Sequence, residues 1–177
     1  MSIESDGKSK DCCLDKGEYH IFTLSTANVD LETSLYLSSA ISRILRRLLK
    51  NEKILDSASA LVVGVGNPDI DADRLGKTVF DQIDITSLER KKVYKFCPNI
   101  YFSTGIETVN MVRMFVKELK IDVVILIDSL STCFPSRLGK SYQITTSGMT
   151  PGSGVNRFGK RINKESVGAK CIAIGVP

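Results

Sequence analysis

The sequence predicts an α/β protein in which helices cover both faces of a parallel-rich sheet. Two apolar runs of strand length, 60–66 and 123–127, are rich in β-branched residues, as buried parallel strands are. Residues 31–50 and 104–120 repeat apolar side chains at helical spacing. Strands and helices that alternate along the chain are typical of such a sheet.

The chain is expected to begin with a leader, followed by a strand and a helix. Residues 1–17 are polar and without periodicity, which indicates a disordered leader or propeptide-like segment. Residues 19–24 have strand character. The helix over 31–50 ends in a basic turn that suits the helix dipole. Its apolar stripe consists of Leu37, Ile41, Ile44, Leu45 and Leu48.

The same signals predict the remaining elements. In order, these are a helix over 73–82, an irregular segment 83–103 with a possible short strand at 93–96, the helix 104–120, a strand near 141–146, a glycine-rich loop at 147–154, a charged turn at 157–164 and a final strand at 171–174. The chain stops directly after that strand, where a loop or helix normally follows. We therefore expect residues 18–177 to form one α/β domain that is incomplete at its C-terminal end.

Composition and charge favour a soluble cytoplasmic domain. Of 177 residues, 42% are hydrophobic and 25% charged, which is enough for one core. The formal net charge is +4, and its densest cluster, 90–92, has no interleaved aromatic residues, so we expect a solvated turn and no nucleic-acid partner. No apolar run is long enough to span a membrane. The five cysteines have no zinc spacing and no signal peptide precedes them, which favours reduced thiols, although Cys12 and Cys13 leave metal binding or redox activity open.

Two aspartates stand just past the two apolar strands. Asp73 follows the first strand after a short loop, and Asp128 ends the second one. The carboxyl ends of parallel strands are where ligands bind in open α/β sheets. Two carboxylates at that edge would share a proton, so that one takes a proton from water and the other donates to a carbonyl. The only histidine, His20, lies far upstream, so a histidine mechanism must use that residue.

Other interpretations of these residues remain open. The Gly64-Val65-Gly66-Asn67 stretch lacks the third glycine of a dinucleotide fingerprint, because that position holds Asp69, so the glycines more simply serve a tight turn. The alternating acids at 69, 71 and 73 lack the rest of a calcium loop. Asp73 alone fits a helix N-cap. Asp128, at the end of an apolar run, must be hydrogen-bonded or functional.

The glycine-rich loop is a second candidate part of a site. Gly152, Ser153 and Gly154 belong to a loop of the kind that presents backbone N–H groups to an oxyanion, although a plain flexible turn is the simpler alternative. Ser153 has no base nearby in the sequence to activate it as a nucleophile. Glu107, at a helix entry, fits a dipole partner better than a catalyst.

Several of these segments together resemble one family, the germination protease of endospore-forming bacteria. The matching motifs occur in order from about Gly17 to the end. They are Gly64-Val65-Gly66-Asn67, Ala72-Asp73-Arg74-Leu75-Gly76, Thr104-Gly105-Ile106-Glu107-Thr108, Ile127-Asp128-Ser129-Leu130, Thr150-Pro151-Gly152-Ser153-Gly154-Val155, Glu165-Ser166-Val167-Gly168 and Ala173-Ile174-Gly175-Val176-Pro177.

The resemblance implies an aspartic-type endopeptidase that degrades small acid-soluble spore proteins during germination. It implies a zymogen that loses an N-terminal segment, a homotetramer and a location in the spore core, and it aligns the family's catalytic aspartates with Asp73 and Asp128. Gly152, Ser153 and Gly154 would then bind substrate, with no cofactor, metal or membrane involved. The family is distantly similar to hydrogenase maturation proteases, which suggests a three-layer α/β/α sandwich with a mostly parallel central sheet.

The departures from the family pattern leave two other functions open. Arg74, Lys77 and Thr150 replace the family's alanine, proline and histidine, and Arg74 would lower the pKa of a neighbouring carboxylate. One alternative is therefore a truncated, inactive paralogue with a binding role or none. Another is a metal-dependent maturation peptidase that holds nickel or zinc with the two acids.

Overall fold

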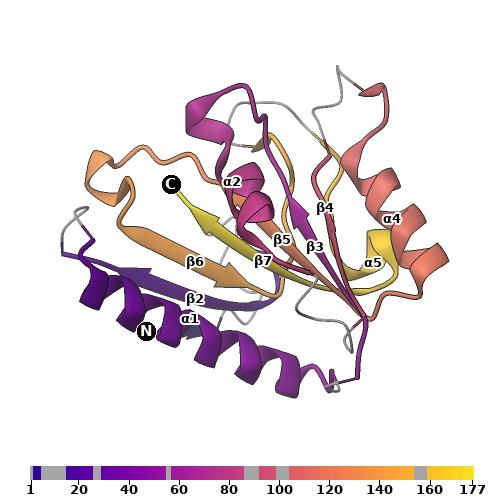
Figure 1. The fold of residues 1–177 in the computed structure, drawn as a ribbon, viewed down its shortest axis with the longest axis horizontal. Coiled ribbons are helices and arrows are strands. Elements are labelled where there is room, and N and C mark those ends of the chain that lie inside the picture. Colours follow the sequence, from indigo (N-terminus) through magenta and orange to yellow (C-terminus); the bar gives the residue numbers. More distant parts are fainter. Residues whose placement is uncertain are drawn as a thin grey trace.

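The computed structural model consists of one twisted sheet between two layers of helices, and it describes residues 2–4, 15–25, 29–54, 57–85, 92–98, 104–153 and 159–177 (Figure 1). The seven strands of the sheet lie in the order β1-β2-β6-β7-β5-β3-β4. Their bounds are β1 Ser2–Glu4, β2 Glu18–Thr23, β3 Ala60–Gly64, β4 Val93–Phe96, β5 Val123–Ser129, β6 Ser141–Thr145 and β7 Lys170–Val176. The helices are α1 Leu31–Asn51, α2 Leu75–Gln82, α4 Thr108–Leu119 and α5 Lys164–Val167, with short 3-10 turns η1 Asp71–Asp73 and η3 Pro135–Arg137.

The sheet has a parallel half and an antiparallel half. Strands β4, β3, β5 and β7 run parallel, and β6, β2 and β1 continue the sheet with antiparallel pairings. The predicted α/β class is confirmed, but the parallel character is confined to the half that carries β3 and β5. This half aligns the carboxyl ends of its strands along one edge, where Asp128 lies opposite Gly175.

Helix α1 covers one face of the sheet. Asp30 caps its first turn by accepting a 2.7 Å hydrogen bond from the Thr33 backbone N–H, as an aspartate N-cap does. Leu48 is fully buried beneath the helix against Val123, Ile144 and Ile172. The apolar stripe predicted for 31–50 therefore packs against this face of the sheet.

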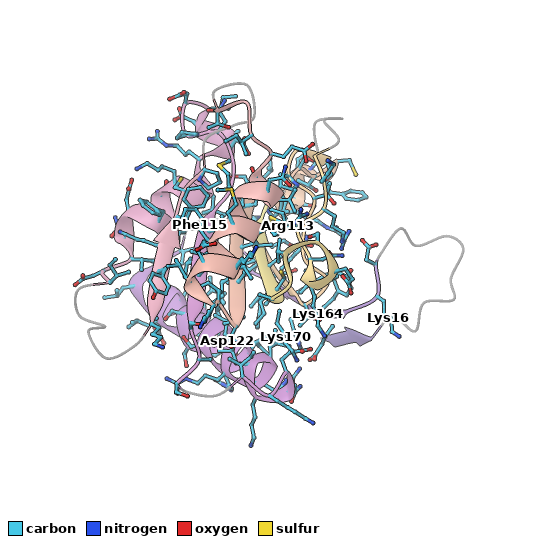
Figure 2. The ribbon with its side chains drawn as sticks, turned by 90° about the vertical axis from the view of Figure 1, so that its right-hand side faces the viewer. Lys16, Arg113, Phe115, Asp122, Lys164 and Lys170 are labelled. Carbon is cyan, nitrogen blue, oxygen red and sulfur yellow. The ribbon has the colours of Figure 1, made fainter. Side chains whose placement is uncertain are left out.

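Helices α4 and α5 cover the opposite face. The valines at 109, 112 and 116 of α4 pack on strand residues that include Val63, Val124 and Leu126. Arg113 joins the two helices, because its Nε donates a 2.7 Å hydrogen bond to the Ser166 carbonyl, and it lies beside α5 in Figure 2. Residues 124, 126 and 128 alternate onto one side of β5, so Asp128 belongs to the face that α4 covers.

Four elements differ from the sequence-based expectations. Helix α2 begins at Leu75 instead of Asp73, and α4 begins at Thr108 because residues 104–106 form a turn closed by the Thr104 hydroxyl. Helix α5 begins at the last residue of the predicted charged turn and was not predicted; it has a capping box between Asn163 and Ser166. The short strand β1 lies inside the expected leader and pairs with β2.

Some predictions lie outside the described residues. These concern Cys12, Cys13, Arg90, Lys91 and Gly154, together with most of the leader. Among the described cysteines, Cys97, Cys133 and Cys171 are free thiols. No helix in the described ranges combines the length and hydropathy needed to cross a bilayer.

Candidate active site

Three glycines bring Asp73 back to the carboxyl end of β3. A Cβ on Gly64 would lie 2.2 Å from the Gly76 carbonyl oxygen, and one on Gly76 would lie 2.2 Å from the Val65 oxygen. Strand β3 and helix α2 therefore touch backbone to backbone. Gly66 has φ 111°, and a Cβ there would lie 2.2 Å from the Asp73 carbonyl oxygen. The predicted tight turn is confirmed, and it determines where Asp73 stands.

Asp73 is held by the loop that it follows. Its Oδ2 accepts a 2.7 Å hydrogen bond from the Asn67 backbone N–H. The N-cap position of α2 is Arg74, so the interpretation of Asp73 as a helix cap is wrong. The Arg74 guanidinium donates to Asp71 Oδ1 at 2.8 Å on the surface.

Asp128 is the buried member of the predicted pair. Only 8% of its surface is exposed, and its Oδ1 is completely buried without a hydrogen-bond partner among the described residues. Burial, and to a smaller extent the negative charge of Asp73, raise the pKa of Asp128 to about 7, although a hydrogen bond from the Ser129 backbone partly offsets both effects. The charge of Asp73 therefore acts on Asp128, so the two acids are electrostatically coupled.

The coupled pair has two distinct chemical capacities. Asp128 binds a proton at neutral and lower pH, and a protonated Oδ1 would gain the donor that its buried position lacks. Asp73 already uses Oδ2 as an acceptor, which leaves Oδ1 to accept from a water. A neutral acid beside a hydrogen-bond acceptor is the arrangement that general acid–base catalysis needs.

The glycine-rich loop is only partly described. Met149 and Ile162 close its base with two backbone hydrogen bonds of 3.0 and 2.7 Å. Gly152 has φ 74°, and the Ser153 N–H donates to the Thr150 carbonyl at 3.2 Å, so this N–H is already engaged within the turn. No hydrogen bond joins Gly152 or Ser153 to either aspartate in the described structure, and Gly154 lies outside it.

His20 lies away from the aspartates, in a cluster that the sequence did not reveal. Its Nε2 is 2.7 Å from Glu18 Oε1 and 3.1 Å from Arg47 Nη2, between β2 and α1. Burial alone would raise the pKa of Glu18, but hydrogen bonds from Arg47 and His20 outweigh burial and lower it. The one histidine is therefore a partner of Glu18, and it does not supply a base to Ser153.

The candidate metal ligands are few at this edge. Among the described residues, no three His, Cys, Asp or Glu side chains converge in a geometry that could hold a metal ion. Asp73 and Asp128 are thus a pair of acids without a third donor of these types in the described structure.

These observations define a class of protein: an α/β/α sandwich with two coupled acids at the carboxyl ends of neighbouring parallel strands. The germination protease family model matches residues 1–177. The chain belongs to the germination protease family.

Individual relatives agree with this assignment. The germination protease of Priestia megaterium is 34% identical over 176 residues, covering 92% of this chain and 47% of the relative. That of Bacillus subtilis is 31% identical over 176 residues, covering 92% of this chain and 48% of the relative. That of Clostridium tetani is 33% identical over 159 residues, covering 84% and 48%. The chain thus spans about half the length of the relatives it matches.

One solved structure has a similar fold. It is a [NiFe] hydrogenase maturation protease, HycI, from Thermococcus kodakarensis, with a TM-score of 0.45 and 20% sequence identity. The similarity covers 68% of this chain and 74% of that chain. The α/β/α assignment itself follows from the sheet order and the two helical layers described above.

Proposed function

We propose that the chain is an aspartic-type endopeptidase and that Asp73 and Asp128 activate the water that cleaves the peptide bond. The observation that carries the proposal is the buried, unpartnered Oδ1 of Asp128, whose pKa of about 7 reflects burial and the charge of Asp73. A carboxyl group with these properties holds a proton at the pH at which its neighbour acts as a base. Membership of a peptidase family supplies the reaction class.

In the proposed mechanism, each acid exchanges one proton with the reacting groups in each cycle. Neutral Asp128 donates its proton to the substrate carbonyl oxygen while Asp73 takes a proton from the attacking water. The tetrahedral intermediate then returns the carbonyl proton to Asp128 as the C–N bond breaks. The leaving nitrogen receives the proton from Asp73, so both groups regain their starting states.

The family suggests the substrate and the setting. We propose that the substrates are small acid-soluble spore proteins and that Gly152 and Ser153 lie along the path of the bound peptide. A zymogen form, a homotetramer and a location in the spore core are further parts of this proposal. Sedimentation of the purified chain measures the assembly directly.

The test is cleavage of a purified small acid-soluble spore protein by the wild-type chain and two variants. Discrete fragments are expected from the wild type. Asp73→Asn and Asp128→Asn should each lower the cleavage rate at least about 100-fold, because each removes one proton-transfer group. Asp71→Asn, a charge-matched change at an exposed position of the same loop, should cleave at close to the wild-type rate.

Circular dichroism and thermal unfolding must show that each variant is folded. Cleavage by either folded catalytic variant at the wild-type rate would refute the mechanism. A folded wild-type chain that yields no fragments would instead favour a non-enzymatic role.

A further inference from the structure

Glu107 has an unusual place for a carboxylate at the start of a helix. It occupies the N-cap position of α4, yet its side chain makes no capping hydrogen bond to the described helix. Its Oε2 is fully buried and has no hydrogen-bond partner among the described residues. This oxygen forms an ion pair with Lys160, whose Nζ lies 3.4 Å away without hydrogen-bond geometry.

Lys160 belongs to the limb of the glycine-rich loop that returns to the core. The limb is close to the outgoing one, because a Cβ on Gly159 would lie 2.8 Å from the Pro151 carbonyl oxygen. Ile162, fully buried, anchors the limb and bonds to Met149 through both of its backbone groups. A contact made by Lys160 therefore acts on the described loop residues 149–153.

The contact lies on the same side of the sheet as Asp128. Helix α4 begins at the edge toward which β3 and β4 point (Figure 1). Val109, the second residue of α4, packs in the same cluster as Val124 and Leu126, which share their side of β5 with Asp128. Glu107 thus ties the loop to the edge that carries the candidate acids.

We propose that Glu107 and Lys160 are positioning residues that hold the glycine-rich loop in place for substrate binding. The inference rests on the proposed function, because a fixed loop matters to catalysis only if a peptide binds beside it. Neither residue touches the reacting atoms. Their loss should therefore weaken binding of substrate and leave the chemical step of the bound substrate nearly unchanged.

The two single variants should raise KM by different amounts. Glu107→Gln removes the charge and leaves an uncharged amide, which should raise KM about two- to fivefold, the size that partly exposed ion pairs contribute. Lys160→Gln leaves the buried Oε2 without its cation, so a larger rise in KM is expected. In both variants kcat should stay near the wild-type value.

The charge swap is the decisive variant. Glu107→Lys and Lys160→Glu should each raise KM when made alone. If the ion pair holds the loop, the double variant that combines them should have a lower KM than either single variant. Lys164→Gln is the matched control, since this lysine lies on α5 beside Lys170 in Figure 2, and it should leave KM unchanged.

A second measurement does not depend on activity. Amide hydrogen exchange of residues 147–153 in the intact chain should be faster in Glu107→Gln and Lys160→Gln than in the wild type and in Lys164→Gln. Unchanged exchange with unchanged KM would overturn the inference, as would single effects that simply add in the double variant. If the wild type cleaves nothing, the proposed function fails, and the exchange rates still decide whether the tether exists.

Discussion

The pH dependence of stability tests the environment of Asp128 independently of activity. The pKa of Asp128 is about 7 in the folded chain against 3.8 for the unperturbed group. Between these values the folded chain holds a proton that the unfolded chain has released. Stability is therefore lost as the pH rises from about 4 to about 7, the reverse of the behaviour of a salt-bridged aspartate.

The magnitude follows from the difference between the two pKa values. A difference of 3.2 units, 7 minus 3.8, corresponds to roughly 4 kcal/mol once both states are ionised, at about 1.4 kcal/mol per unit. At pH 5 the same expression gives only about 1.5 kcal/mol, because the folded chain is still protonated there. The stability contribution of Asp128 should thus fall by about 2.5 kcal/mol between pH 5 and pH 8.

Asp128→Asn is the reference that isolates this contribution. Urea unfolding of the wild type and Asp128→Asn at pH 5 and pH 8 gives the difference in unfolding free energy between the two proteins at each pH. The contributions of the other titrating groups are common to both proteins and cancel in this difference. The advantage of the variant should grow by about 2.5 kcal/mol from pH 5 to pH 8. In an Asp73→Asn background, Asp128→Asn should still gain stability between pH 5 and pH 8, but by a smaller amount. Burial is the larger cause of the raised pKa of Asp128 and remains when the charge of Asp73 is removed.

An equal difference at both pH values would refute the argument that Asp128 is protonated near neutrality. A difference that shrinks as the pH rises would show that the folded environment favours the charged form.

Two further predictions concern activity and backbone geometry. The kcat/KM of peptide cleavage should fall as the pH rises through about 7, since the proposed acid must be protonated; a rate that is flat to pH 9 would contradict this role for Asp128. Gly66→Ala should lower both the melting temperature and activity, because its Cβ would lie 2.2 Å from the Asp73 carbonyl oxygen at a φ of 111°. Gly139→Ala, at φ 62° with no atom within 4 Å of its Cβ, measures the backbone strain alone, of order 1–2 kcal/mol, and an equal loss in both variants would show that the contact with Asp73 is unimportant.

Much of the fold was predictable from local patterns. The helix over 31–50 and the strand 123–127 stand within two residues of the predicted bounds, because each is long enough for its period to be clear. The four-residue helix α5 is too short to show a period. Its capping pair, Asn163 and Ser166, and the left-handed Gly168 after it were the available signals.

The antiparallel half of the sheet depends on contacts that local patterns do not specify. Strand β2 pairs with β6 more than a hundred residues later, with Tyr19 opposite Thr145. A period of two shows which side chains share a face but does not show the partner strand or its direction. The mixed sheet therefore could not be deduced from the pattern that predicted each strand.

The candidate site, like the fold, was predictable only in part. The ends of the two apolar runs indicated the places of Asp73 and Asp128, because parallel strands bring the residues at their carboxyl ends to one edge of the sheet. The buried oxygens of Asp128 and Glu107 that have no hydrogen-bond partner among the described residues could not be foreseen, because their surroundings are formed by segments distant in the sequence. The Glu18, His20 and Arg47 cluster was hidden for the same reason, since its members come from β2 and α1.

The contact between Gly64 and Gly76 limits how this edge can vary. No side chain separates β3 from α2 there, so no change of rotamer can absorb a shift between them. Even a methyl group at either position would wedge the strand and the helix apart, and Asp73, which lies between the two glycines in the chain, would move with the wedge. The two glycines thus set how closely strand β3 and helix α2 approach, and the position of Asp73 depends on that approach.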